Sequence, residues 1–219
     1  MVSVFVSREL SPESSLRTWL TEQGWTWYAQ SLLRFESVDF NLPDQPLDWV
    51  FFYSSKAVSF WAHRQPKLGG QVKFAALGPG TAKTMTDYQI PVDFRGKGTP
   101  EQVALAFLSV AQRQRVLFPR AEESRRSVER ALGGQIMASD LIVYRNQPAP
   151  RTDLVPTDIV ILTSPLNVRS YFSSTNINPK ATFLAIGPTT AAALTAYDME
   201  AHYPEQPGEE GLVALLQEL

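Results

Sequence analysis

Two segments of the 219-residue chain place glycine, proline and threonine where a strand would turn into a helix. They are FAALGPGTAKTM (74–85) and FLAIGPTTAAAL (183–194). Such a turn leaves backbone N–H groups unpaired at the start of the helix, and the helix dipole favours negative charge there. The segments therefore predict sites for a carboxylate or a phosphate, unless the glycines serve only a tight turn. The candidate ligands are Gly78, Thr81, Gly187, Thr189 and Thr190.

A second pair of segments puts a serine at an expected helix start. Ser54 lies in YSSKAV (53–58) and Ser164 in LTSPLNV (162–168), each after an apolar run. Neither serine needs a role beyond capping its helix. In a parallel sheet, however, all of these turns lie at the carboxyl ends of the strands, where α/β proteins bind ligands. Four helix starts with hydroxyl side chains thus favour a binding edge more than any one of them alone.

Three further side chains could take part in such a site. Arg8 and Arg120 end the similar strands VFVSR and VLFPR, where a guanidinium could pair with a carboxylate or simply be solvated. Tyr144 lies in an apolar strand, LIVYRN, and its counterpart in the first half of the chain is Phe35. From the residues alone, packing is the simpler role for this tyrosine.

Composition excludes several other kinds of chemistry. The chain has no Cys and only two His, His63 and His202, which leaves no thiolate nucleophile and no residue set for a catalytic metal. Its net charge of −2 gives no field that attracts nucleic acid, and neither GxGxxG nor GxxxxGK[ST] is present for a nucleotide. No apolar stretch has the length of a membrane span or the form of a signal peptide. We therefore expect a soluble, cytoplasmic protein.

The elements that would position these residues occur twice. Aligned residues of the two halves differ in number by 109 to 112, for example 187 − 78 = 109 and 116 − 4 = 112. So many matches in register indicate an internal duplication. Each half follows the pattern strand, helix, strand, strand, helix, strand, helix, which predicts an α/β fold with parallel sheets covered on both faces.

Local signals mark the ends of the expected helices. Ser11 before Pro12 predicts an N-cap with proline in the first turn. Gly24 and Gly133 lie where helices should stop. The aromatic run GWTWY (24–28) predicts packing in the core or at a domain interface.

Taken together, these motifs resemble the uroporphyrinogen-III synthase family of tetrapyrrole (heme) biosynthesis. The resemblance covers nearly the whole chain, and FLAIGPTTAAAL is its closest match. The other segments that carry it are VFVSRE, DWVFFYSSKAVSFW, FAALGPGTAKTM, VLFPRAEESRRSVERAL, IVYRNQP and DIVILTSPLNVRSYF.

For the fold, the resemblance implies two flavodoxin-like α/β domains joined by a two-stranded antiparallel linker. The duplicated halves would be exchanged between the domains. One domain would comprise residues 1–33 and 149–219, the other residues 38–140, and the linker strands would be residues 31–37 and 141–147. Tyr144 would then lie beside an inter-domain cleft, which makes it a candidate catalytic residue.

For function, the resemblance implies that the linear tetrapyrrole hydroxymethylbilane is cyclised to uroporphyrinogen III in that cleft, with loss of water and inversion of ring D. The enzyme would need no metal or cofactor. Because no coiled-coil or obvious dimer motif argues against it, a monomer is the default expectation, and composition favours neither nucleic acid nor a membrane as a partner. Tyr144 would donate a proton or a hydrogen bond to the leaving hydroxyl group. The acetate and propionate groups of the substrate would meet the N–H groups at the helix starts. The substrate-binding set would be Ser54, Gly78, Thr81, Ser164, Gly187, Thr189, Thr190, Arg8 and Arg120.

Two other classes of protein stay open at this stage. The same architecture could serve as a non-enzymatic sensor or ligand-binding relative of the synthase, or as a phosphate- or sugar-binding α/β protein. The order of the motifs disfavours the second class. Retention of Tyr144 and of both Gly-Pro-x-Thr turns favours the enzyme over the first.

Overall fold

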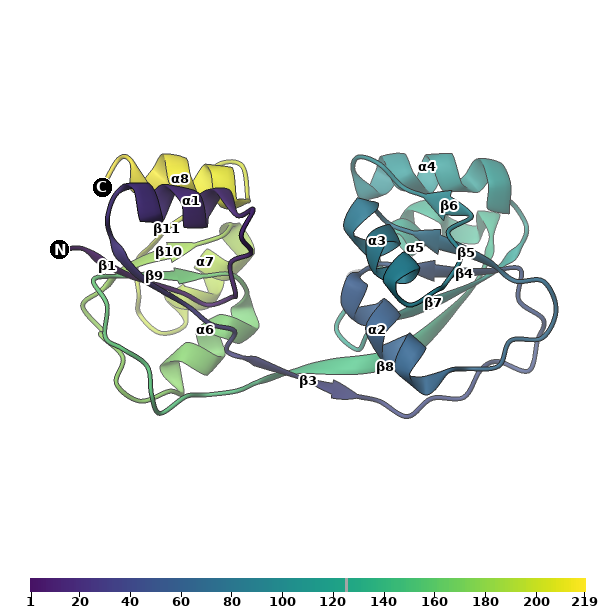
Figure 1. Cartoon of the computed structure of the whole chain (residues 1–219), viewed down its shortest axis with the longest axis horizontal. Coiled ribbons are helices and arrows are strands. Elements are labelled where there is room, and N and C mark those ends of the chain that lie inside the picture. Colours follow the sequence, from purple (N-terminus) through teal and green to yellow (C-terminus); the bar gives the residue numbers. More distant parts are fainter. Residues whose placement is uncertain (125) are drawn as a thin grey trace. The chain divides into compact units, whose positions relative to one another are not determined.

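The chain folds into two compact units, each built around one β-sheet (Figure 1). The structure is a computed structural model and describes residues 1–124 and 126–219. Residues 1–34 and 147–219 form the first unit, and residues 35–146 form the second.

The first unit contains a five-stranded sheet in the order β11-β10-β9-β1-β2, and all of its strand pairs are parallel. Its strands are β1 (Ser3–Val6), β2 (Thr26–Ala29), β9 (Ile159–Leu162), β10 (Thr182–Ala185) and β11 (Ala201–His202). Its helices are α1 (Ser15–Glu22), α6 (Pro165–Phe172), α7 (Pro188–Thr195) and α8 (Glu209–Leu216). The N-terminal segment and the C-terminal third of the chain share this sheet, because β1 pairs with β9 in the register Phe5↔Val160.

Helices cover both faces of this sheet, as the short apolar runs predict. The α1 and α8 helices lie side by side on one face (Figure 1), and α6 packs against α7. Alternate residues of β1 accordingly enter different cores: Val4 and Val6 pack beneath α1 and α8, and Phe5 packs with α6 and α7. A strand that is buried on both sides must be apolar at every position, and residues 4–6 of β1 are.

The second unit contains a six-stranded sheet in the order β3-β8-β7-β4-β5-β6. Its strands are β3 (Leu33–Ser37), β4 (Trp49–Phe52), β5 (Lys73–Ala76), β6 (Phe94–Arg95), β7 (Arg115–Ala121) and β8 (Met137–Pro148). Its helices are α2 (Ser55–Arg64), α3 (Pro79–Asp87), α4 (Pro100–Ala111), α5 (Ser127–Leu132) and the short 3₁₀ turn η1 (Gly133–Gln135). From β8 to β6 every pair is parallel.

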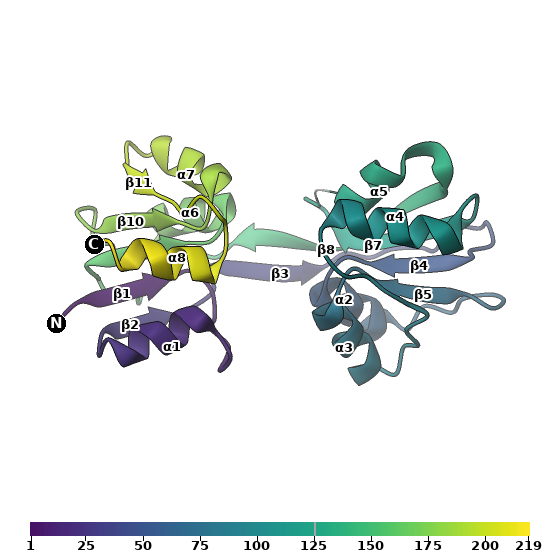
Figure 2. The ribbon, with the colours of Figure 1, turned by 90° about the horizontal axis from the view of Figure 1, so that it is seen from above.

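Figure 2 shows α4 and α5 on one face of this second sheet and α2 and α3 on the other. Alternation along β4 again serves two cores, with Trp49 and Phe51 on the α4–α5 side and Val50 and Phe52 on the α2–α3 side. Phe51 is fully buried, and its ring lies 5.0 Å from the ring of Phe107. The prediction of an α/β fold with parallel sheets is confirmed.

The predicted start of the first helix is wrong. Residues 12–13 form a turn, and the N-cap of α1 is Ser14, whose Oγ accepts a hydrogen bond from the N–H of Arg17 at 3.1 Å. Ser11 accepts the N–H of Ser14 only through its backbone carbonyl. The reason lies in α8: the Ser14 hydroxyl also donates to Glu209 at 2.7 Å, a contact that local sequence does not reveal.

The sequence interpretation assigned residues 24–28 to packing and did not predict that part of this segment is a strand. Residues 26–29 form β2, a strand at the edge of the first sheet, which pairs with β1 as Phe5↔Tyr28. Trp27 packs on the core, whereas Tyr28 is 39% exposed. Gly24 ends α1 at φ +65°, and Gly133 ends α5 at φ +54°, so both predicted helix stops are confirmed.

Replacement of the observed cap should destabilise the protein, and replacement of the predicted one should not. We expect Ser14→Ala to lower the free energy of unfolding by about 1–2 kcal/mol, because it removes the cap of α1 and leaves Glu209 with one donor fewer. Ser11→Ala, at an exposed position, should change it by less than about 0.5 kcal/mol. Urea unfolding of both variants measures the difference, and equal effects would contradict the capping assignment.

Candidate functional site

The carboxyl ends of the strands in the first unit carry a cluster of hydrogen-bonded hydroxyl groups. Ser7 follows β1 and Thr163 follows β9, and their side-chain oxygens lie 3.2 Å apart. The N–H of Thr163 donates to the Ser7 hydroxyl at 2.9 Å, and Nδ2 of Asn167 donates to the Thr163 hydroxyl at 3.1 Å. Ser7 and Asn167 are buried, so these hydrogen bonds hold the ends of β1 and β9 in place beneath the surface of this edge.

Both serines predicted at helix starts are N-caps. Oγ of Ser54 accepts the N–H of Ala57 at 3.2 Å at the start of α2, and Oγ of Ser164 accepts the N–H of Asn167 at 3.2 Å at the start of α6. The capping interpretation is therefore confirmed for both. Each cap uses one acceptor position of the hydroxyl. The Ser164 proton stays available to an incoming carboxylate, whereas the Ser54 side chain also interacts with Tyr144.

The two Gly-Pro turns begin α3 and α7 without any side-chain cap. Gly78 has φ −161° and Gly187 has φ 176°, extended values that any residue adopts, so the backbone does not require glycine at either position. A Cβ on Gly78 would meet no atom of the described residues within 4 Å, whereas one on Gly187 would lie 3.2 Å from Pro207. The absence of a side chain at Gly78 leaves the first N–H groups of α3 open to a ligand.

The three threonines of these turns differ in accessibility. Thr81 and Thr190 are 7% and 3% exposed, and Thr189 is exposed. Thr189 is therefore the hydroxyl that a ligand reaches most directly.

Tyr144 lies on β8 at the carboxyl edge of the second sheet, where Ala121 at the end of β7 pairs with it. It is 6% exposed, and its ring stacks on Phe60 of α2 with 5.0 Å between the centroids. Burial raises the pKa of the Tyr144 phenol, and a hydrogen-bonding interaction with the Ser54 side chain offsets part of that rise. Within the second unit the fold thus brings together two residues predicted separately, Tyr144 and Ser54.

Arg8 is held by a carboxylate of its own unit. Its guanidinium donates to Glu209 at 2.6 Å, and its Nε is buried without a hydrogen-bond partner among the described residues. Burial alone would raise the pKa of Glu209, but hydrogen bonds from Ser14 and from the Leu16 N–H, together with the charge of Arg8, outweigh it and lower the pKa. Arg8 is thus oriented by Glu209, and contact with a substrate stays a prediction.

Arg120 belongs to a network of charges in the second unit. It is only 11% exposed, pairs through Nε with Asp140 and donates to the backbone carbonyls of Ala121 and Glu122 at 2.9 Å each. Arg126 donates to the second oxygen of Asp140 at 2.8 Å. Burial alone would raise the pKa of Asp140, but these two arginines lower it overall.

Sequence reasoning missed Ser7, Thr163, Asp140 and Glu209. Ser7 and Thr163 come directly after apolar runs, so the rule that located Ser54 and Ser164 would have found them. The two acids could not be found in this way, because Asp140 is 20 residues from Arg120 and Glu209 is 201 residues from Arg8. The described residues contain no cluster of three or more His, Asp or Glu that could hold a metal ion. Within them, no helix is long and apolar enough to cross a membrane.

The chain is thus an α/β protein of two units, and in each unit polar turns lie at the carboxyl ends of the parallel strands. Open α/β sheets bind their ligands at this edge. The family model described as uroporphyrinogen-III synthase HemD matches residues 14–214. The chain therefore belongs to the uroporphyrinogen-III synthase family.

Solved structures show the same fold. A uroporphyrinogen-III synthetase from Helicobacter pylori 26695 is 21% identical, with a TM-score of 0.71, and the match covers 100% of this chain and 99% of that one. A mutant uroporphyrinogen III synthase from the extremely thermophilic bacterium Thermus thermophilus is 18% identical, with a TM-score of 0.52, and the match covers 100% and 97%. Comparison with curated protein sequences returns no significant match.

The Asp140 network makes a pH-dependent contribution to stability. We expect Asp140→Asn to lower the free energy of unfolding by about 1–3 kcal/mol at neutral pH, because it weakens two hydrogen bonds from arginine. Folding lowers the pKa of Asp140, so its contribution is complete above the unfolded-state pKa of about 3.9 and is lost as pH falls through the lower folded-state value.

Urea unfolding of the wild type and the variant between about pH 2 and pH 8 measures this contribution. The difference between them should be constant at neutral pH and shrink in acid. Asp153→Asn, which breaks an exposed pair with Arg151, is the control and should have a smaller effect. A difference for Asp140→Asn that is undiminished at the acid end would rule out the ionised pair as its source.

Proposed function

We propose that this chain cyclises hydroxymethylbilane to uroporphyrinogen III, with loss of water and inversion of ring D. The observation that carries the proposal is the match of the synthase family model to residues 14–214. The geometry agrees with it, because each sheet ends in hydrogen-bond donors suited to a substrate with an acetate and a propionate on every pyrrole ring. A non-enzymatic relative is the less favoured alternative.

The donors that we propose for the carboxylates lie at four helix starts. Two are capped by serine, at Ser54 and Ser164, and two are left uncapped, at Gly78 and Gly187. Thr81, Thr189 and Thr190 complete the set. Donors at helix starts bind anions without a basic side chain, so a chain of net charge −2 can still bind a polycarboxylate. Arg8 and Arg120 are proposed as cationic ligands with their unused N–H groups.

Tyr144 is proposed as the catalytic group. Since burial raises its pKa, the phenol stays protonated at neutral pH and can donate to the hydroxyl group that leaves as water. Loss of that group gives an electrophilic azafulvene, and attack by the substituted carbon of ring D gives a spiro intermediate. We infer that the rest of the acceleration comes from holding a flexible chain with its first and last rings in reacting orientation.

We further propose that the fold arose by duplication, with the halves exchanged between the domains. The sheet orders support this: β11-β10-β9-β1-β2 and β6-β5-β4-β7-β8 follow one pattern when the repeat is aligned. The proposed domains are residues 1–33 with 149–219, and residues 38–140.

The proposed linker is antiparallel and comprises residues 31–37 and 141–147. It is supported by hydrogen bonds from the Val38 N–H to the Val143 carbonyl and from the Ala149 N–H to the Leu32 carbonyl. In these pairs one residue number rises as the other falls, which is the antiparallel pattern. Residues 137–144 of β8 also pair in parallel with β7, so the second linker strand continues a strand of the sheet. Action as a monomer in the cytoplasm stays a prediction.

The activity is tested by the isomer of the product. Freshly generated hydroxymethylbilane is incubated with the protein, and the oxidised porphyrins are separated into type I and type III. Enzyme-dependent type III supports the synthase. Type I alone, which forms spontaneously, would favour the non-enzymatic relative.

Tyr144→Phe should lower kcat about 100-fold and leave the fold intact, since about 100-fold is the lower end of what a positioned general acid contributes. Tyr171→Phe is a matched control: that tyrosine is also buried, lies on α6 and has a raised pKa. It should leave kcat unchanged. Wild-type turnover in Tyr144→Phe would refute the donor role.

Gly78→Ala should raise KM about fivefold or more with stability changed by less than about 1 kcal/mol, because the new Cβ meets no protein atom but covers the open N–H groups of α3. Gly69→Ala, equally unhindered and outside the turn, is the control. An unchanged KM in Gly78→Ala would argue against a carboxylate at this turn.

A further inference from the structure

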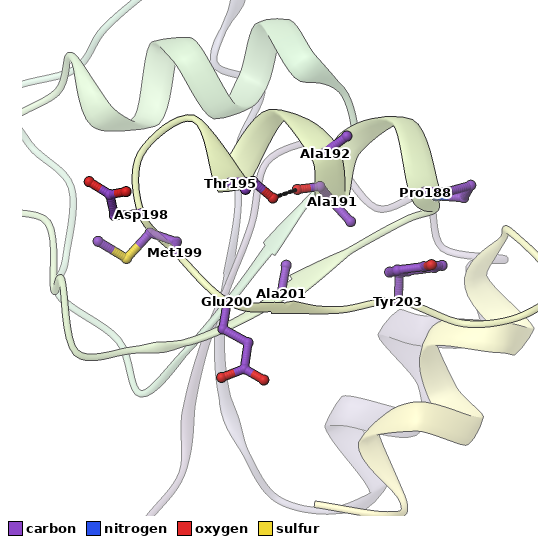
Figure 3. Close-up of a pocket in the computed structure, with 9 residues that line it drawn as sticks. All are labelled: Pro188, Ala191, Ala192, Thr195, Asp198, Met199, Glu200, Ala201 and Tyr203. Carbon is purple, nitrogen blue, oxygen red and sulfur yellow. Dashed lines mark hydrogen bonds between the residues drawn. The ribbon is translucent and has the colours of Figure 1, made fainter.

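Two open hollows flank the outer edge of the first unit's sheet. One part, of about 610 Å³, lies between α7 and the chain that leads into and out of β11 (Figure 3). A second part, of about 550 Å³, shares Tyr203 with the first and lies beside α8, which covers the opposite face of the sheet from α7. We call both parts together the β11 groove.

The floor of the β11 groove is apolar. Figure 3 shows Ala191 of α7 and Ala201 of β11 pointing toward one another, with Met199 and Tyr203 beside them. Tyr203 is 48% exposed, and Leu215 of α8 supplies an apolar side chain to the lining of the second part. Apolar side chains alternating along an extended segment would fit such a floor.

The rim of the groove is acidic. Residues 181–219 contain six Asp or Glu and no Lys or Arg. The remaining residues contain 20 basic and 16 acidic side chains, so their net charge is +4. Glu209 is paired with Arg8. The other five line the groove: Asp198, Glu200, Glu205, Glu210 and Glu218. No basic side chain is among the described residues that line it.

This charge distinguishes the groove from the proposed substrate site. A polycarboxylate would be repelled by five carboxylates, and these acids do not form a metal-binding cluster among the described residues. The fold does not require the acidity either. The equivalent edge strand of the second sheet, β6, is followed by Lys97 and contains Arg95.

The backbone of β11 offers a second element of recognition. β11 is the last strand of its sheet and pairs on one side only, with β10, through Phe183↔Ala201 and Leu184↔His202. None of the described strands pairs with its outer edge. Such an edge accepts an added strand, which gains main-chain hydrogen bonds while its side chains choose the sequence.

We propose that the β11 groove docks an extended segment of another protein that carries lysine or arginine alternating with apolar residues. The segment adds to the outer edge of β11, its apolar side chains lie on the floor, and its cationic side chains meet the five carboxylates. Opposite charge at the rim makes the association strongly dependent on ionic strength.

Synthetic peptides test this directly. Acetyl-KVKVKVK-amide and the matched acetyl-EVEVEVE-amide are titrated into the ¹⁵N-labelled full chain. The cationic peptide should shift the amide signals of residues 188–203 and of α8, and raising the salt from about 50 to about 300 mM should weaken its binding about fivefold or more. The acidic peptide should bind at least about tenfold more weakly.

Charge reversal identifies the surface. Glu200→Lys with Glu205→Lys should weaken the cationic peptide about tenfold or more and leave type III product formation unchanged, which keeps this test separate from the proposed activity. Glu13→Lys with Glu22→Lys makes the same change of charge at exposed positions of the same unit, and should leave binding near the wild-type value.

Three results would overturn the proposal. They are shifts spread over other acidic surfaces, an equal loss of binding in the control variant, and concentration-dependent self-association that the Glu200→Lys with Glu205→Lys variant abolishes. The last would make a second copy of the chain the occupant.

Discussion

The rest of the structure depends on one constraint: parallel strands covered by helices on both faces bring every strand end and every helix start to the same edge of the sheet. In each unit this edge collects hydroxyl groups and unpaired N–H groups from segments far apart in the sequence. Ser7 and Thr163 meet within 3.2 Å although 156 residues separate them. The buried apolar strands thus serve as the support of the site, because any change in their register would move the donors as well.

The four helix starts are of two kinds, capped and uncapped. The serines that begin α2 and α6 satisfy their own helices, while the glycines that begin α3 and α7 provide no side-chain acceptor. Extended φ values show that the backbone conformation requires glycine at neither position. At Gly78, no atom of the described part of the chain lies within 4 Å of an added Cβ. An open helix start is poorly satisfied until an anion binds, which suits a polycarboxylate substrate on a chain with little net charge.

The sequence predicted what periodicity and local chemistry determine. The apolar strands, the stops at Gly24 and Gly133 and the caps Ser54 and Ser164 follow from residue type and spacing. It failed where a distant residue decides: Glu209 on α8 makes Ser14 rather than Ser11 the cap of α1, and pairing with β1 makes residues 26–29 a strand. The ion pairs of Arg8 and Arg120 could not be predicted from the sequence for the same reason, because their partners are neighbours only in the folded chain. The roles of Tyr144 and the donor turns toward substrate stay predictions.

The central claim is that the uncapped starts of α3 and α7 receive substrate carboxylates. The most direct measurement is a titration of the ¹⁵N-labelled chain with uroporphyrin III, the oxidised form of the proposed product. The account predicts that the amide signals of Gly80, Thr81 and Thr189 shift together with one midpoint. They should shift more than those of Ala57, whose N–H is already bonded to Ser54, and Thr190, whose N–H is already bonded to the Gly187 carbonyl. Shifts that spare both uncapped turns, or that are confined to the acidic groove beside β11, would contradict it.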